Sequence, residues 1–209
     1  MASQPIYQFY SELAEYTPKI WRRFQVAGNI SVARLGYIVM TLYEMQASHA
    51  FTVAYPINKN LAATEAAIQG GTGKIVPFRP AEEYCHFEIP SNDSFPSVQD
   101  HRIMDATAMT LNRLSADPGL ALSVMYDPGD GWEVRLTLEQ VTEDKALQGR
   151  ELPRVLEGEG FGIIENCGGP GGLAHLAEVF TVKSGEEYES LSKWLGKADL
   201  DLTALAWRT

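Results

Sequence analysis

Two runs of alternating apolar and polar residues, joined by a short loop, constrain the fold of this chain more than any other feature. Leu120, Leu122, Val124 and Tyr126 share one face of the run 120–126, and apolar residues alternate with Glu, Arg and Thr over 132–139. Alternation with a period of two is typical of strands with one buried face. The loop Tyr126-Asp-Pro-Gly-Asp-Gly-Trp132 is rich in turn-forming residues. The sequence therefore predicts a β-hairpin with a loop slightly longer than the two-residue type.

Asp127 and Asp130 in this loop have carboxylates that could bind a hard metal ion. A calcium loop, however, needs more oxygen ligands at regular spacing and a closing glutamate, which this stretch lacks. Aspartate is also a preferred turn residue, because its side chain bonds to nearby backbone amides. We therefore interpret both aspartates first as turn residues.

The remaining patterns predict an α+β fold, in which a mostly antiparallel sheet of hairpins packs against a few amphipathic helices. Ser31 is a predicted N-cap, and Ser184-Gly-Glu-Glu187 has the pattern of a capping box. The glycine-rich residues 154–172 predict irregular backbone. Further strands are predicted over 6–13, 20–26, 48–55 and 84–89, and helices over 32–46, 61–68, 103–114, 172–180 and 184–195, with one more short helix in the tail, 199–209.

The chain of 209 residues is predicted to be a single domain. Residues 56–101 have a weak pattern, and we interpret them as an insertion or an elaborated connection. They include Gly70-Gly-Thr-Gly-Lys74, which resembles a phosphate-binding loop. That motif would also need Gly in place of Ile68 and Ser or Thr in place of Ile75, so we do not predict a nucleotide site.

Charge and composition narrow the classes of partner. The formal net charge of -10 argues against a broad basic surface for nucleic acid. It suits polar or basic protein partners, but simple solubility explains the same charge and is the interpretation that we favour. The two cysteines, Cys85 and Cys167, lack zinc-site spacing and are predicted to be free thiols.

No cofactor and no membrane span are predicted, and without a recognisable signal peptide we expect a cytoplasmic protein. The sequence does not fix the oligomeric state.

Three further positions carry side chains suited to binding. Arg22 and Arg23, beside Trp21, could grip a carboxylate or a phosphate. A solvated strand face, or pairing with acidic loops, explains the same arginines, and Trp21 can stack on Arg23. His49 could be a ligand or a base, but a histidine that shares a strand face with Phe51 and Val53 is more often a packed core or edge residue.

Four segments, in the same order along most of the chain, resemble the plasmid pRiA4b ORF-3-like family, whose members are also described as passenger "TnpR" proteins of insertion elements. The resemblance implies an α+β domain and an origin on plasmids, phages or other mobile elements. It implies little about activity. Residues 56–101 are not covered. The matching residues are Ile20–Val26, Ser48–Phe51, Tyr126–Glu133 with Leu136–Glu139, and Glu157–Glu159 with Glu165–Gly171.

The chain departs from the family pattern at several positions. The family usually has Phe at Pro128, His at Val134 and Asp at Asn166. It also usually carries two further cysteines, at the positions of Val155 and Gly162. If the family's cysteines or histidines bind a metal, these replacements imply that this chain has lost that site.

Two functional hypotheses remain, with a weaker third. The first is a non-enzymatic accessory protein of a mobile element that binds another protein, such as a host defence or DNA-processing enzyme that it could inhibit, as anti-CRISPR proteins do. The second is a metal-assisted hydrolase, and the third is a resolvase-like accessory protein that binds DNA through its arginines. Because no catalytic motif is assembled, we favour a protein that is not an enzyme. The candidate polar site is His49, Asp127, Asp130, Glu165 and Cys167, and the candidate binding residues are Trp21, Arg22, Arg23 and Trp132.

Overall fold

Eight strands form one sheet in the order β5-β4-β3-β6-β7-β1-β2-β8. A computed structural model of the chain describes residues 4–57, 59–60, 83–90, 103–115, 117–144 and 151–204. All neighbouring strands are antiparallel except the pair β4 and β5. The fold is therefore α+β, as predicted. The elements are β1 (Ile6–Leu13), β2 (Trp21–Ala27), α1 (Val32–Leu42), β3 (Phe51–Pro56), β4 (Tyr84–Glu88), β5 (Ile103–Asp105), α3 (Leu111–Leu114), β6 (Ala121–Tyr126), β7 (Trp132–Thr142), β8 (Arg154–Glu159), α4 (Gly169–Val182) and α5 (Glu186–Leu195).

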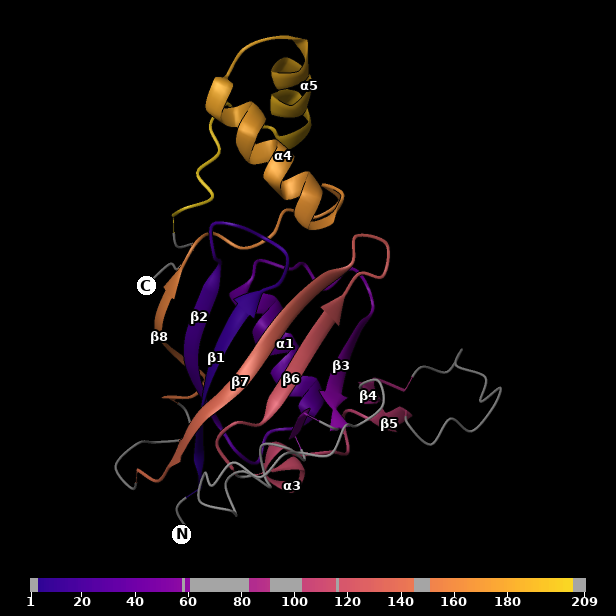
Figure 1. Cartoon of the computed structure of the whole chain (residues 1–209), viewed down its shortest axis with the longest axis vertical. Coiled ribbons are helices and arrows are strands. Elements are labelled where there is room, and N and C mark those ends of the chain that lie inside the picture. Colours follow the sequence, from indigo (N-terminus) through magenta and orange to yellow (C-terminus); the bar gives the residue numbers. More distant parts are fainter. Residues whose placement is uncertain are drawn as a thin grey trace, which may run out of the picture.

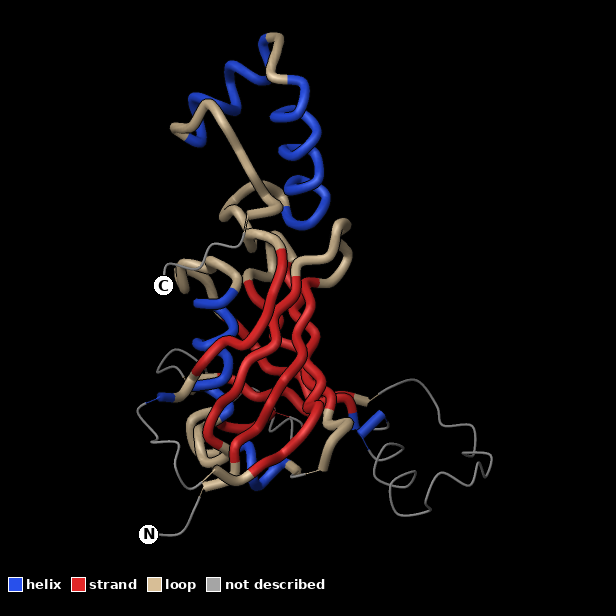
Figure 2. The backbone as a smooth tube through the Cα atoms, turned by 90° about the vertical axis from the view of Figure 1, so that its left-hand side faces the viewer, coloured by secondary structure: helices blue, strands red, loops and turns tan. Residues whose placement is uncertain are grey.

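The core lies between α1 and one face of the sheet (Figures 1 and 2). Alternate residues of the central strands point into it, among them Phe9, Phe24 and Val134, which are fully buried. The opposite face carries polar or exposed side chains such as Met125 and Arg135. The period-two patterns of the sequence arise from this difference between the two faces.

The predicted hairpin is formed by β6 and β7, which pair from Tyr126 with Trp132 to Ala121 with Thr137. The backbone N–H of Gly131 donates to the carbonyl of Asp127 at 2.7 Å and closes the loop. Tyr126 and Trp132, which flank the loop, are both buried. The loop is therefore anchored at its base by two large aromatic side chains.

Helix α1 begins as predicted, because the Ser31 hydroxyl accepts a hydrogen bond from the backbone N–H of Arg34 at 3.1 Å. It ends at Leu42, before the predicted end near Gln46. Glu44 and Ala47 have φ values of 59° and 57°, so the chain turns left-handed there and leaves the helix. This turn leads directly into the segment that carries His49.

The prediction of a helix over 103–114 is wrong in its first half. Residues 103–105 form β5, and only Leu111–Leu114 are helical. The Asp105 carboxylate accepts hydrogen bonds from the backbone N–H groups of Thr107 and Ala108. These local bonds compete with helix formation, since they hold the backbone in a turn.

The glycine-rich segment and the C-terminal part also differ from expectation. Residues 154–159 form β8, which pairs with β2, where irregular backbone was predicted. Helix α4 begins at Gly169, earlier than predicted, and α5 has Gly185 as its N-cap, with no side-chain hydrogen bond, so the predicted capping box does not form. Residues 201–204 are not helical. The helix predicted over 61–68 and the last five residues of the tail lie outside the described residues.

Helices α4 and α5 pack against each other and project beyond the end of the sheet (Figure 1). Helix α4 buries Leu173, Leu176 and Phe180, whereas α5 buries no residue. Among the described residues, no helix has both the length and the apolar character that a membrane span requires.

Candidate functional site

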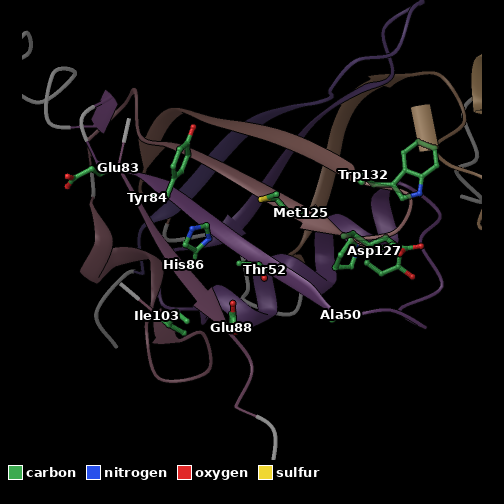
Figure 3. Close-up of a pocket in the computed structure, with 13 residues that line it drawn as sticks. Ala50, Thr52, Glu83, Tyr84, His86, Glu88, Ile103, Met125, Asp127 and Trp132 are labelled. Carbon is green, nitrogen blue, oxygen red and sulfur yellow. The ribbon is translucent and has the colours of Figure 1, made fainter. Parts of the chain in front are cut away.

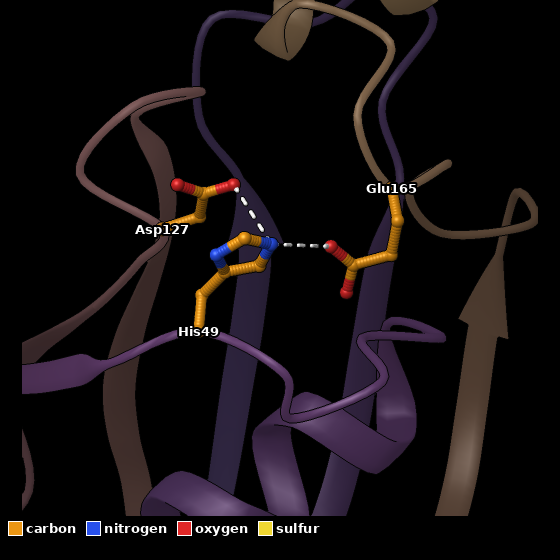
Figure 4. A group of neighbouring side chains, drawn as sticks. All are labelled: His49, Asp127 and Glu165. Carbon is orange, nitrogen blue, oxygen red and sulfur yellow. Dashed lines mark ion pairs between the residues drawn. The ribbon is translucent and has the colours of Figure 1, made fainter.

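His49, Asp127 and Glu165 come from three distant parts of the sequence and meet beside the hairpin loop (Figure 4). His49 lies just before β3, Asp127 begins the loop between β6 and β7, and Glu165 precedes α4. Because β3 is the neighbour of β6 in the sheet, the start of β3 and the end of β6 lie together. The backbone N–H of Asp127 donates to the carbonyl of Ala50 at 3.1 Å and fixes this contact.

The three side chains point toward one another without forming direct hydrogen bonds. His49 Nε2 lies 3.5 Å from Asp127 Oδ2 and 3.8 Å from Glu165 Oε2. One ligand atom from each residue can be chosen so that all three lie within 4.8 Å of one another. The side chains of Asp127 and Glu165 are 10% and 6% exposed, and that of His49 is 35% exposed. The cluster is thus buried on its carboxylate side and open to solvent at the histidine.

The other oxygen of each carboxylate is held by a separate donor. Gly129 N–H donates to Asp127 Oδ1 at 2.9 Å. The Tyr126 hydroxyl and the backbone N–H of Gln46 donate to Glu165 Oε1 at 2.7 and 2.8 Å. Burial raises the pKa of Tyr126, so its hydroxyl stays protonated and can donate. In the described part of the chain, Glu165 Oε2 is buried and has no hydrogen-bond partner.

Asp130 and Cys167, which the sequence grouped with these residues, contribute no atom to the cluster. They lie near each other instead: the sulfur of Cys167 donates to the carbonyl of Gly169 at 3.6 Å, and a Cβ on Gly169 would lie 2.2 Å from the carbonyl oxygen of Asp130. Burial, with a smaller effect of the Asp130 charge, raises the pKa of Cys167 to about 11. A thiol with this pKa is a poor nucleophile at neutral pH.

Arg22 lies inside the protein, fully buried. Its guanidinium donates to five backbone carbonyl oxygens, those of Trp21, Leu42, Glu159, Gly160 and Phe161, at 2.6 to 3.1 Å. These bonds join β2 to the end of α1 and to the segment after β8. The guanidinium therefore faces backbone, not solvent.

Arg23 and Trp21 lie on the opposite, exposed face of the sheet. Arg23 binds Glu139 through two hydrogen bonds, Nε to Oε2 at 2.7 Å and Nη2 to Oε1 at 2.9 Å, and it also pairs with Glu157. Its guanidinium lies 5.6 Å from the centre of the Trp21 ring, and Trp21 Nε1 donates to Glu159 at 3.1 Å. Both side chains are thus already engaged within the sheet face.

A groove of about 630 Å³ lies over β3, β4, β5 and β6, on the face of the sheet opposite the core (Figure 3). Met125 is one of its lining residues. Three of its lining side chains are apolar and exposed: Tyr84 at 42%, Ile103 at 50% and Met125 at 48%. Its charged lining residues are Glu83, Glu88 and Asp127, and the described lining contains no lysine or arginine. Trp132 and Asp127 close one end, so the groove and the cluster share the hairpin loop.

The groove was missed in the sequence because its lining comes from separate segments, the start of β3, β4, β5 and the β6–β7 hairpin, which only the strand order brings together. One local signal was present at Met125, a large apolar residue at a position whose neighbours in register are polar. Its partner across β6 and β7 is Glu133. In the structure, Met125 lines the groove together with the exposed side chains of Tyr84 and Ile103.

Comparisons with known proteins identify relatives without a described activity. The profile of the plasmid pRiA4b ORF-3-like protein family matches residues 5–207. The chain is 30% identical over 102 residues to the uncharacterized protein y4hQ of Sinorhizobium fredii, an alignment that covers 48% of this chain and 51% of that one. It thus spans about half the length of that relative. A crystal structure of a protein of unknown function from Methanosarcina mazei, MM3350, has the same fold, with a TM-score of 0.71, 19% identity and 97% and 96% of the two chains covered.

Proposed function

This chain belongs to the plasmid pRiA4b ORF-3-like family, and from that premise we propose that it is a mobile-element accessory protein that acts by binding another protein. The observation that supports the proposal is the groove with Tyr84, Ile103 and Met125 exposed along it. Isolated exposed apolar side chains are ordinary, but three that line one depression make a contact surface. The groove is the part of the described surface best suited to receive a partner.

The charge of the groove selects the kind of partner. Glu83 and Glu88 lie at its β4 side and Asp127 at its other end, with no lysine or arginine among the described lining residues. The whole chain carries a formal net charge of -10. A segment with an apolar anchor flanked by lysines or arginines would place its apolar group on Met125 and its charges on the carboxylates.

Host defence and DNA-processing enzymes present such basic segments, because they bind nucleic-acid phosphates with lysine and arginine. An acidic protein that occupies a basic surface of this kind keeps nucleic acid away from it. We therefore include inhibition of a host enzyme in the proposal. This part of it is supported by the charge of the groove and by the plasmid origin in the family's name.

The test uses two fluorescent peptides of equal length, each with a central Leu-Phe anchor, one flanked by lysine and arginine and the other by glutamate. Fluorescence anisotropy should show binding of the basic peptide alone, with an affinity that falls as salt is added. Met125→Ser should weaken binding at least about tenfold, equivalent to about 1.4 kcal/mol, because it removes the apolar contact of the anchor without changing the charge of the groove.

Trp194→Ser is the matched control, because Trp194 is similarly exposed but lies on α5, away from the groove. This variant should bind the basic peptide as the unmodified protein does. Equal binding of both peptides, or an unchanged affinity of Met125→Ser, would contradict the proposal.

A further inference from the structure

We propose that His49, Asp127 and Glu165 form a binding site for one divalent transition-metal ion, with Zn²⁺ as the probe. The site lies beside the groove and shares Asp127 with it. The residues offer one nitrogen and two oxygens from different segments, all facing one point (Figure 4).

The distances between the ligand atoms suit an intervening ion better than direct contacts. A charge-assisted hydrogen bond between nitrogen and a carboxylate oxygen spans about 2.7–2.9 Å. The gaps from His49 Nε2 are longer, 3.5 Å to Asp127 and 3.8 Å to Glu165. Ligands about 2.1 Å from a tetrahedral zinc ion lie roughly 3.4 Å apart. A small inward movement of the side chains would therefore complete the coordination.

The hydrogen bonds around the cluster orient both carboxylates toward this point. Gly129 holds Asp127 Oδ1, and Tyr126 and Gln46 hold Glu165 Oε1. The second oxygen of each carboxylate is left to face His49, as in metal sites whose ligands are fixed by outer hydrogen bonds. Glu165 Oε2 is buried and has no hydrogen-bond partner among the described residues, an arrangement that is costly unless a cation or donor satisfies it.

The ligand types select among cations. Calcium takes six to eight oxygens, and magnesium keeps several of its waters and prefers oxygen ligands. An imidazole nitrogen with two carboxylates suits zinc, manganese or iron, of which zinc binds most strongly. Because His49 is 35% exposed, the fourth position faces solvent and can hold water, as in open zinc sites with three protein ligands.

An ion pair of protonated His49 with both carboxylates is the competing explanation. Titration calorimetry of metal-stripped protein with Zn²⁺, Mn²⁺ and Mg²⁺ separates the two. The metal site predicts one equivalent of Zn²⁺, weaker binding of Mn²⁺ and no binding of Mg²⁺ at the same concentrations, with a Tm that rises as Zn²⁺ is added. An ion pair predicts no stoichiometric binding, and that result would overturn the proposal.

Asp127→Asn and Glu165→Gln each remove one charged ligand but keep an acceptor for the surrounding amides. Each should weaken Zn²⁺ binding at least about tenfold. Matched controls are His175→Ala and Glu187→Gln, since these residues form an exposed pair, Nε2 to Oε1 at 2.8 Å, elsewhere in the chain. The controls should leave the Zn²⁺ affinity unchanged. Unchanged affinity in both cluster variants would refute the assignment.

A further measurement uses the unmodified protein and therefore does not depend on whether the variants fold. Co²⁺ in place of Zn²⁺ should give the visible absorption of a site with nitrogen and oxygen ligands. A strong near-ultraviolet thiolate-to-cobalt band would identify Cys167 or Cys85 as a ligand and overturn the proposal. The absence of that band, together with one bound equivalent, would support it.

Discussion

Arg22 and Arg23 are neighbours on β2, and they lie in opposite environments because successive side chains of a strand point to opposite faces. Arg22 is buried among five backbone carbonyl oxygens, while Arg23 binds Glu139 and Glu157 at the surface. Burial lowers the pKa of Arg22, but a guanidinium stays charged throughout the ordinary pH range. The positive charge inside the protein is thus stabilised by carbonyl dipoles, and Arg22 acts as a structural cross-link.

Cys167 gives a prediction at the scale of a single residue. With a pKa of about 11, raised by burial and then by Asp130, only about one thiol in a thousand is ionised at pH 8. In a Cys85→Ser background, the rate of labelling by a disulfide reagent should rise about tenfold per pH unit between pH 8 and pH 10. Stopped-flow absorbance would measure this rate.

Asp130→Asn should increase the labelling rate at pH 8, because removing a nearby negative charge lowers the pKa of the thiol. Asp199→Asn, a change at an exposed carboxylate that pairs with Lys183, is the control and should have no effect. Labelling of the folded protein as fast as that of the unfolded chain would show that the sulfur is not buried as described.

At the scale of elements, the first turn of α4 contains two adjacent glycines with opposite surroundings. A Cβ on Gly172 would lie 1.7 Å from the backbone carbonyl oxygen of Cys167, whereas a Cβ on Gly171 would meet no atom within 4 Å. Gly171→Ala should stabilise the protein by about 0.5–1 kcal/mol, since alanine favours a helix. Gly172→Ala should destabilise it by about 1–3 kcal/mol, because backbone must move to admit the methyl group. Urea denaturation of both variants measures the difference, and equal effects would contradict this packing.

The elements that could be read from the sequence are those with one buried face. β1, β2, the β6–β7 hairpin and α1 alternate or repeat strongly because half of their side chains enter the core. β5 and β8 gave no such signal, since all three residues of β5 are exposed and β8 contains glutamates and a glycine. Both are outer strands of the sheet, held by backbone hydrogen bonds to one neighbour, and such bonds do not depend on side-chain pattern.

The sequence predicted which types of residue form the candidate site, but not which of the five named residues lie together. His49, Asp127 and Glu165 were named from their chemistry, together with Asp130 and Cys167. The pairing of β3 with β6 and the return of the chain before α4 determine which of them meet. No local pattern encodes these contacts between distant segments, because they depend on the order of strands in the whole sheet.

At the scale of the whole molecule, stability is distributed unevenly. The central strand β1 pairs with β7 from Ile6 with Thr142 to Leu13 with Val134, and the two strands contribute buried side chains such as Phe9 and Leu136. Helix α5 lies beyond the end of the sheet and has no buried residue. Local opening should therefore cost least free energy at α5 and most in the central strands.

Hydrogen–deuterium exchange followed by mass spectrometry tests this distribution. Amides of α5 should exchange at least about a hundredfold faster than those of β1 and β7, with α4 between them because Leu173, Leu176 and Phe180 are buried. If the amides of α5 were protected from exchange as well as those of the central strands, α4 and α5 would be held by contacts other than those described.

The backbone of Asp127, with φ of 50°, has a consequence for how this position should change during evolution. Glycine adopts a left-handed conformation without steric cost, and asparagine tolerates it as well as aspartate does. Drift under selection for folding alone would therefore replace this residue by glycine or asparagine in a diverging population. In a laboratory evolution experiment, the population can instead be selected for the protein's biological effect. If aspartate is then retained over many generations, its carboxylate contributes to that effect and not only to folding.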